Sequence, residues 1–156
     1  MRVRIIAIGT RMSAWVDAAY SDYSLRLRAG MPVELLELAV ASRKDAGVPA
    51  KAKAAEAVRI MAALAPREHV VALDERGKEF STVELAQWLE ERRRSGLDLC
   101  FVIGGPDGLA DVVLQRSQQR WSLSRLTLPH GMVRVLLAEQ LYRATTILAG
   151  HPYHRA

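Results

Sequence analysis

Short apolar runs alternate along this chain with segments of helical periodicity, and this alternation restricts the possible fold more than any other feature. The apolar runs are Val3–Gly9, Val33–Val40, His69–Asp74 and Leu99–Ile103. Leu99–Ile103 is apolar throughout, which is typical of a strand buried on both faces of a parallel sheet. Strands that alternate with helices form open sheets with helices on both faces. We therefore expect an α/β fold with a mostly parallel sheet.

The segments between these runs carry signals for helix ends. Ser81 and Glu84 have the spacing of a capping box, in which each side chain satisfies the other residue's free amide. Gly96 and Gly150 follow periodic segments, where glycine favours the end of a helix. Helices are expected over about residues 13–27, 50–64, 81–96, 109–119 and 132–149.

Three stretches are predicted to lie between or beyond these elements. The polar stretch Arg43–Pro49 is the best candidate for a mobile loop. Gly77 is expected to mark a loop on the carboxyl side of the sheet, after the strand that ends at Asp74. The stretch Trp121–Leu128 contains either a final strand or an extended loop.

Length and composition favour one domain over residues 1–156. The chain has 156 residues, half of them hydrophobic, which is enough for a single buried core. No signal-like segment follows Met1, and no run of eighteen apolar residues occurs, so we expect a cytoplasmic protein without a membrane segment. Cys100, the only cysteine, lies inside an apolar run and is predicted to be a core residue.

The net charge of +5 suggests a polyanionic partner, because clustered Lys and Arg displace counterions from phosphates. Charge alone is a weak argument. The densest run, Arg92–Arg94, closes a predicted helix, where cations interact favourably with the helix dipole, and is interpreted as a solvated helix end.

A glycine-rich turn, Gly104–Gly108, directly follows the strand at Leu99–Ile103. In open α/β sheets ligands bind beyond the carboxyl ends of the strands, so this turn lies where a pocket is expected. It is equally consistent with a simple tight bend between a strand and a helix. Its spacing matches neither dinucleotide-binding nor phosphate-binding loops, which disfavours dinucleotide and NTP sites.

The segment Trp121–His130 interleaves hydroxyl groups with leucines and ends in a proline and a histidine. Such a loop could hold an adenine, with backbone amides at its edge and Leu123, Leu126 and Leu128 against its faces. The pattern fits an edge strand with a polar outer face equally well.

Several segments along the chain form one recognisable combination. They are Val3–Thr10 with Met12, Leu73–Asp74, Ile103–Pro106, Trp121–His130, Val133–Leu136, Glu139, Leu141–Ala144 and His151–Arg155. Taken together, these segments resemble the ribosomal RNA large subunit methyltransferase H family of small SPOUT-class enzymes, and the resemblance spans essentially the whole chain. Asp107 stands where glutamate is commoner in that family, and Gly131 lies at a position that varies.

The resemblance implies a C-terminal trefoil knot that holds S-adenosylmethionine, and a homodimer. It also implies methylation of N3 of a pseudouridine in 23S rRNA, on the assembled ribosome at the subunit interface. The residues expected to bind the cofactor are Leu73, Gly104, Gly105, Leu123, Ser124, Arg125, Leu126, Thr127 and Leu128.

Methyl transfer to an imide nitrogen requires in-line positioning and a proton acceptor, and needs no metal. His154 and His130 are the candidate acceptors, because histidine titrates near neutral pH. Without the resemblance, a terminal histidine would be interpreted as exposed. The pair His151 and His154 is not expected to bind metal, because Pro152 interrupts any helix there.

The remaining catalytic candidates come from the last helix and the tail. Glu139 and Arg143 are four residues apart, either as a plain ion pair or as organisers of the pocket. Tyr153 is expected to stack on an extruded base. Arg155 and Arg134 are expected to contact RNA.

Two other functions fit the same sequence. One is ribose 2′-O-methylation by an enzyme of the same class, which would use the same cofactor pocket. The other is a non-catalytic, basic ribosome-binding protein.

Overall fold

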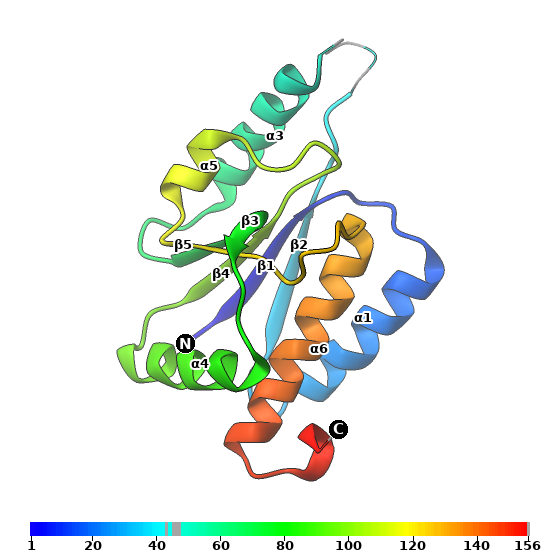
Figure 1. Cartoon of the computed structure of the whole chain (residues 1–156). Helices are drawn as coiled ribbons and strands as arrows, with labels where there is room; N and C mark the ends of the chain where they lie inside the picture. Colours follow the sequence, from blue (N-terminus) through cyan, green and yellow to red (C-terminus); the bar gives the residue numbers. More distant parts are fainter. Residues whose placement is uncertain (43, 45–47, 156) are drawn as a thin grey trace.

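A computed structural model of the chain describes residues 1–42, 44 and 48–155. It contains one five-stranded sheet in the order β2-β1-β4-β3-β5, and every pairing between neighbouring strands is parallel. Figure 1 shows the sheet between two groups of helices. The predicted α/β class with a parallel sheet is confirmed.

The strands lie close to the predicted positions. They are β1 (Val3–Ile8), β2 (Val33–Leu38), β3 (His69–Lys78), β4 (Leu99–Ile103) and β5 (Gln119–Trp121). β1 and β4 are central and almost completely buried, because their side chains are apolar on both faces.

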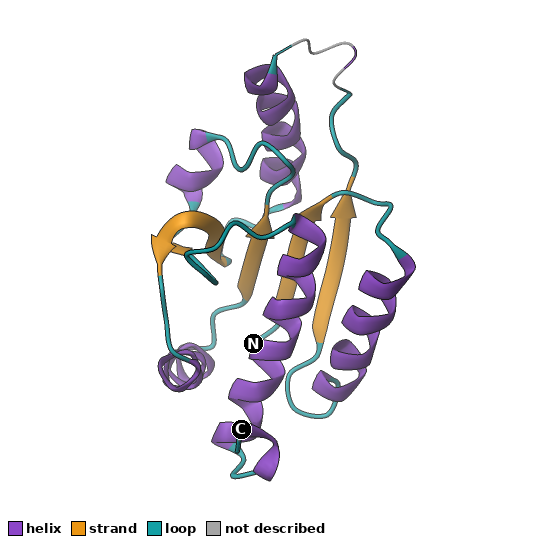
Figure 2. Cartoon of the chain, turned by 45° about the vertical axis from the view of Figure 1, so that its right-hand side comes forward, coloured by secondary structure: helices purple, strands orange, loops and turns teal. Residues whose placement is uncertain are grey.

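The helices are α1 (Ala14–Leu27), α3 (Pro49–Ala63), α4 (Thr82–Ser95), α5 (Asp111–Arg116), α6 (His130–Leu148) and the short 3₁₀ helix η1 (Pro152–His154). Alternate residues of β1 point to opposite faces of the sheet. Ile5 packs in a core with α1, α4 and α6, whereas Ile6 packs in a second core with α3 and α5. Figure 2 shows this arrangement of helices about the strands.

Helix ends follow the local sequence signals. Ser81 and Glu84 form the predicted capping box at the start of α4. Gly96 ends that helix with a φ of 71°, and Gly150 follows α6 with a φ of 67°. Both angles are left-handed, a conformation that glycine adopts without the steric cost of a Cβ.

Two predicted boundaries are wrong. Gly77 was expected in a loop, but β3 continues through it to Lys78, because the end of β3 pairs with Trp121 of β5 after an irregularity in register. A Cβ on Gly77 would lie 2.5 Å from the backbone carbon of Trp121, so the close approach of β3 and β5 requires glycine there. The helix expected over residues 109–119 is shorter, since Gln119 already belongs to β5.

Cys100 is fully buried on β4, as predicted, and burial raises the pKa of its thiol to about 12. No helix within the described residues is long and apolar enough to cross a membrane. Of the predicted mobile loop at Arg43–Pro49, residues 43 and 45–47 lie outside the described part of the chain. The knot stays a prediction.

Candidate active site

The carboxyl ends of β3, β4 and β5 meet at one edge of the sheet. Leu73 of β3 is in register with Ile103 of β4 on one side and with Trp121 of β5 on the other. The glycine turn after β4 and the segment after β5 therefore leave the sheet side by side. Parallel pairing alone brings together three stretches that are far apart in sequence.

The glycine turn is tight and depends on glycine at two positions. The amide of Gly108 donates to the carbonyl of Gly105 at 3.0 Å, and Gly108 has a φ of 80°. A Cβ on Gly104 would lie 2.8 Å from the carbonyl carbon of Gly108, which is closer than packed atoms approach. The turn thus presents bare backbone at the end of β4.

The segment 122–129 after β5 is a loop held by its own hydroxyl groups. Ser122 donates from its hydroxyl to the carbonyl of Ser124 at 2.8 Å, and the amide of Leu126 donates to the hydroxyl of Ser124 at 2.9 Å. The amide of Ser122 donates to the carbonyl of Lys78 at 2.9 Å, which fixes the loop to β3. The interleaved serines therefore shape the loop.

These stretches surround a cavity of about 650 Å³, a size typical of small-molecule sites. Leu126, which lines the cavity from the loop, is 76% exposed. Of the residues predicted to bind a cofactor, those that line the cavity are Leu73, Gly104, Gly105, Leu123, Ser124, Leu126, Thr127 and Leu128. Arg125 is not among them: its side chain is 81% exposed and lies 3.9 Å from Glu79.

The cavity also includes residues that were not predicted. Asp74, Glu75 and Arg76 continue β3 past Leu73, and the acid at the end of the predicted strand was a usable signal for them. Lys53 reaches the cavity from α3. No sequence signal marked Lys53, because it lies in an ordinary helical pattern of alanine and lysine.

His130 begins α6 and forms part of the cavity wall. Burial is the main reason that its pKa lies below the usual histidine value, and the nearby cation of Arg134 lowers the pKa further. The carboxylate of Glu56 acts in the opposite direction. The imidazole is therefore neutral at neutral pH and able to accept a proton.

A second cluster lies on the second half of α6, where the tail packs against the helix. Nε of Arg143 donates to Oε1 of Glu139 at 2.8 Å, and the Tyr153 hydroxyl donates to the same oxygen at 3.2 Å. The guanidinium of Arg143 also lies 4.8 Å from the centre of the Tyr153 ring. Burial, together with the hydroxyl of Tyr23 and the charge of Glu139, raises the pKa of Tyr153, which keeps its hydroxyl protonated.

The tail is ordered against the end of α6 by its own side chains. Nδ1 of His151 accepts from the amide of Tyr153 at 3.2 Å, and Pro152 occupies the first position of η1. Nδ1 of His154 is buried and has no hydrogen-bond partner within the described residues. Arg155 is exposed, as a residue that contacts RNA would be.

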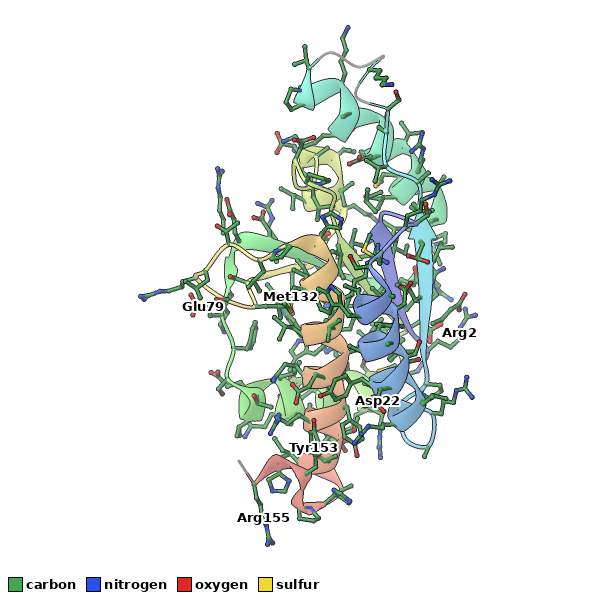
Figure 3. All side chains as sticks on the ribbon, turned by 90° about the vertical axis from the view of Figure 1, so that its right-hand side faces the viewer. Arg2, Asp22, Glu79, Met132, Tyr153 and Arg155 are labelled. Carbon is green, nitrogen blue, oxygen red and sulfur yellow. The ribbon has the colours of Figure 1, made fainter. Side chains whose placement is uncertain are left out.

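The cavity and the tail cluster are far apart within one chain. At 1.5 Å per residue, the nine residues from His130 to Glu139 span roughly 13 Å of helix. Figure 3 shows Met132 near the start of α6, Tyr153 beside the last turns of the helix and Arg155 beyond them. The structure therefore brings His130 to the cavity but does not bring the tail cluster there.

Arg134 does not fit the prediction that it contacts RNA. Its side chain is only 1% exposed. The guanidinium is directed inward, where it pairs with the carboxylate of Glu37 and donates to the carbonyl oxygens of Ile8 and Gly9. These internal contacts hold Arg134 inside the protein, so the assignment is corrected.

No group of three or more His, Cys, Asp or Glu side chains in the described part of the chain is arranged to share a metal ion. His151 uses its Nδ1 atom to cap η1 rather than to face His154.

Comparisons with known proteins identify close relatives over the whole length. Residues 1–154 match the family described as "Predicted SPOUT methyltransferase". The chain is 50% identical over 155 residues to the ribosomal RNA large subunit methyltransferase H of Hahella chejuensis, covering 99% of each chain. It is 50% identical over 156 residues to the protein of the same name from Bordetella pertussis, covering both chains fully.

Two solved structures share the fold. A probable methyltransferase from Bordetella pertussis Tohama I aligns with a TM-score of 0.57 and 19% identity, over 92% of this chain and 93% of that one. A probable methylase family protein from Haemophilus influenzae aligns with a TM-score of 0.56 and 14% identity, over 97% of this chain and 69% of that one. At these identities the similarity concerns the fold alone.

Proposed function

The chain belongs to the SPOUT methyltransferase family, and from this premise we propose that it transfers the methyl group of S-adenosylmethionine to N3 of a pseudouridine in 23S rRNA. The names of the curated relatives support ribosomal RNA of the large subunit as the substrate. The observation that carries the proposal is the cavity at the carboxyl ends of β3, β4 and β5.

The lining of the cavity fits S-adenosylmethionine. A nucleoside needs apolar walls for its base, and Leu73, Leu123 and Leu128 supply them. It also needs close approach to backbone, which the glycine turn permits because a Cβ on Gly104 would already crowd the turn. A positively charged sulfonium favours nearby carboxylates, and Asp74 is part of the wall.

Catalysis in this proposal is mainly a matter of orientation and proton removal. The bound cofactor supplies a methyl group activated by its attachment to a sulfonium. Loss of the N3 proton makes the nucleotide nitrogen nucleophilic, so a neutral acceptor is required. His130 at the cavity wall and His154 in the tail are the two acceptors that we propose. Tyr153 and Arg155 hold the extruded base and its phosphate.

We also propose that the chain works as a homodimer, because its own tail lies far from its own cavity. In such a dimer the tail of one protomer would complete the cavity of its partner. Two further observations support a second copy packed against α1 and α6, which Figure 2 shows side by side. Trp15 and Leu25 on α1 are 54% and 55% exposed, and large apolar side chains in this state favour association.

The shared site can be tested by mixing two inactive variants. Gly104→Val disables the cavity, and Arg143→Met disables the tail cluster. If each site combines the two protomers, half of the dimers in an equal mixture are mixed and each holds one intact site, so about a quarter of wild-type activity returns. Mixtures that remain inactive after unfolding and refolding together would exclude a shared site.

Cofactor binding can be measured by calorimetry. We expect the wild-type protein to bind S-adenosylmethionine, and Gly104→Val to lose binding. Gly30→Val is the matched control, since Gly30 has no neighbour within 4 Å of the added carbon. Absence of heat with the wild-type protein would instead favour a non-catalytic ribosome-binding protein.

The modified atom can be identified by mass spectrometry of 23S rRNA from cells that lack this chain. A missing methyl group on the base of a pseudouridine supports the proposal, whereas a missing ribose methyl group supports 2′-O-methylation. We expect whole ribosomes to be better substrates than purified rRNA, which would place the activity in the cytoplasm. Equal activity on both substrates would argue against recognition of the assembled ribosome.

A further inference from the structure

Arg134 is the largest of the fully buried side chains, yet it carries a charge. Burial of a cation is unfavourable unless its charge and its donors are matched. The two terminal nitrogens of Arg134 meet this requirement with groups from two strands: the carboxylate of Glu37 on β2, and the carbonyl oxygens of Ile8 and Gly9, at 3.3 and 2.6 Å, where β1 ends. Its Nε atom is buried without a hydrogen-bond partner among the described residues. The side chain therefore ties α6 to the carboxyl ends of two parallel strands.

This tie lies directly beside His130. Residues four apart on a helix share a face, so His130 and Arg134 are neighbours on α6. Gly9, whose φ is 114°, lies against both of them: a Cβ there would be 3.3 Å from Nη2 of Arg134 and 3.7 Å from Nε2 of His130. The end of β1, the guanidinium and the imidazole thus form one packed unit.

A buried carboxylate lies on the opposite side of the cavity wall. Glu56 of α3 is only 2% exposed, and its Oε1 atom accepts from the amide of Ala41 at 3.1 Å. A Cβ on Gly105 would be 3.2 Å from a carboxylate oxygen of Glu56, so this group lies directly behind the glycine turn. His130 is consequently influenced by a buried cation and a buried anion from different elements.

We propose that Arg134 is a positioning residue of the candidate active site: by tying the end of β1 to the start of α6, it holds the imidazole of His130 at the cavity wall. Glu56, behind the glycine turn, supplies the buried negative charge that acts on His130 from the other side. Other charged groups at the cavity are Lys53, Asp74, Glu75, Arg76, Asp107 and Asp111, whereas Glu37 balances the charge of Arg134 itself.

The arrangement has a directional consequence for the imidazole. Arg134 disfavours the charged form of His130, and Glu56 favours it. Removal of the two charges should therefore move the pKa of His130 in opposite directions. If Arg134 supported stability alone and did not hold its charge beside the imidazole, Arg134→Met would leave the pKa of His130 unchanged. The inference rests on the proposed function only in assigning His130 the role of proton acceptor.

The test is an NMR titration of the histidine side chains in the full chain, with the His130 signal assigned by its loss in His130→Gln. We expect Arg134→Met to raise the pKa of His130 and Glu56→Gln to lower it. Arg94→Met is the matched control, because it removes the same charge from a helix end where the side chain is 77% exposed. Unchanged titration of His130 in both test variants would overturn the proposal.

A second measurement separates charge from geometry. Arg134→Lys keeps the cation but cannot reach Glu37 and both carbonyl oxygens at once. We expect it to leave the pKa of His130 closer to that of the wild type than Arg134→Met does, and to weaken binding of S-adenosylmethionine about tenfold, or 1.4 kcal/mol. Wild-type affinity in Arg134→Lys would refute the positioning role.

These readouts also distinguish the two proposals. If the wild-type protein binds no S-adenosylmethionine, the proposed function fails, while the titration of His130 still decides the role of Arg134. If Arg134→Met does not fold, Glu37→Gln provides a milder change. We expect Glu37→Gln to leave Arg134 unbalanced and to lower the pKa of His130, and a rise or no change there would contradict the arrangement.

Discussion

Gly77→Ala is expected to destabilise the protein through one added carbon atom. Gly77 lies in β3 where that strand crosses the end of β5. The new Cβ would lie 2.5 and 2.6 Å from the backbone carbon and nitrogen of Trp121, and 2.7 Å from the backbone carbon of Arg120. All three atoms belong to the backbone, so no rotation of a side chain relieves the overlap.

The size of the effect follows from what must move. Non-bonded carbon atoms pack best at roughly 3.5–4.0 Å, so β3 and β5 must separate by about 1 Å at this point. Overpacking of this kind costs about 1–3 kcal/mol. The bond from the amide of Ser122 to the carbonyl of Lys78 would be strained by the same movement, at a further cost of about 1 kcal/mol. We therefore expect a loss of about 2–4 kcal/mol.

The assay is thermal unfolding without cofactor at a fixed protein concentration. For a chain of this length the loss corresponds to a midpoint lower by roughly 5–15 °C. Gly30→Ala is the control, because nothing lies within 4 Å of its added carbon, and it should change stability by less than about 1 kcal/mol. Equal midpoints for Gly77→Ala and Gly30→Ala would refute the argument that the crossing of β3 and β5 requires glycine.

Three further predictions concern other parts of the molecule. Glu68 is buried, and although burial alone would raise the pKa of its carboxyl, hydrogen bonds from Arg4 at 2.7 and 2.8 Å help to hold that pKa below the usual value. The stabilisation of the folded protein by this ion pair is therefore present above the unfolded-state pKa of Glu68 and is lost as pH falls through its folded-state pKa. Urea unfolding should show that Glu68→Gln costs about 3 kcal/mol of stability near pH 7 and less in acid. Cys100 should react with a thiol reagent only when urea unfolds the chain, because burial raises its pKa to about 12, and rapid reaction of the folded protein would contradict this. Tyr153→Phe removes the hydrogen bond to Glu139 and should lower methylation of ribosomes at least about tenfold. The cofactor affinity measured by calorimetry should stay unchanged, and a loss of that affinity would contradict this role of Tyr153.

The central strands were predictable because their sequences leave little choice. β4 is an unbroken apolar run, and β1 is nearly so, which matches burial on both faces of a sheet. The second half of β3 was not predictable. Its residues from Asp74 to Lys78 are mostly polar and include a glycine, so local sequence favours a loop. Its strand conformation comes from pairing with β5, which is a tertiary interaction.

The cavity was predictable for a similar reason. Ligands bind beyond the carboxyl ends of parallel strands, so the position of Gly104–Gly108 after a buried strand predicts a pocket there. The grouping of Leu73 with Gly104 came from the resemblance to the family, and the register of β3 and β4 places the two residues together. Lys53 could not be grouped with them, because helix periodicity does not say which turn of α3 passes the cavity. The packing of the tail against α6 was also beyond the sequence, since periodicity does not say which side chains the residues after Gly150 contact.

The two arginines of the apolar helix α6 lie at two different places, one near the cavity and one near the tail. Isolated charges within such a helix would be costly, and both of its arginines are paired. Arg143 pairs with Glu139 on the helix itself, and the hydroxyl of Tyr153 in the tail donates to the same carboxylate. Arg134 pairs instead with Glu37 on β2, which fixes the start of α6 to the sheet. Of the two pairs only that of Arg134 joins α6 to another element, so loss of Arg134 should affect the cavity end of the helix, whereas loss of Arg143 should affect the contact with the tail.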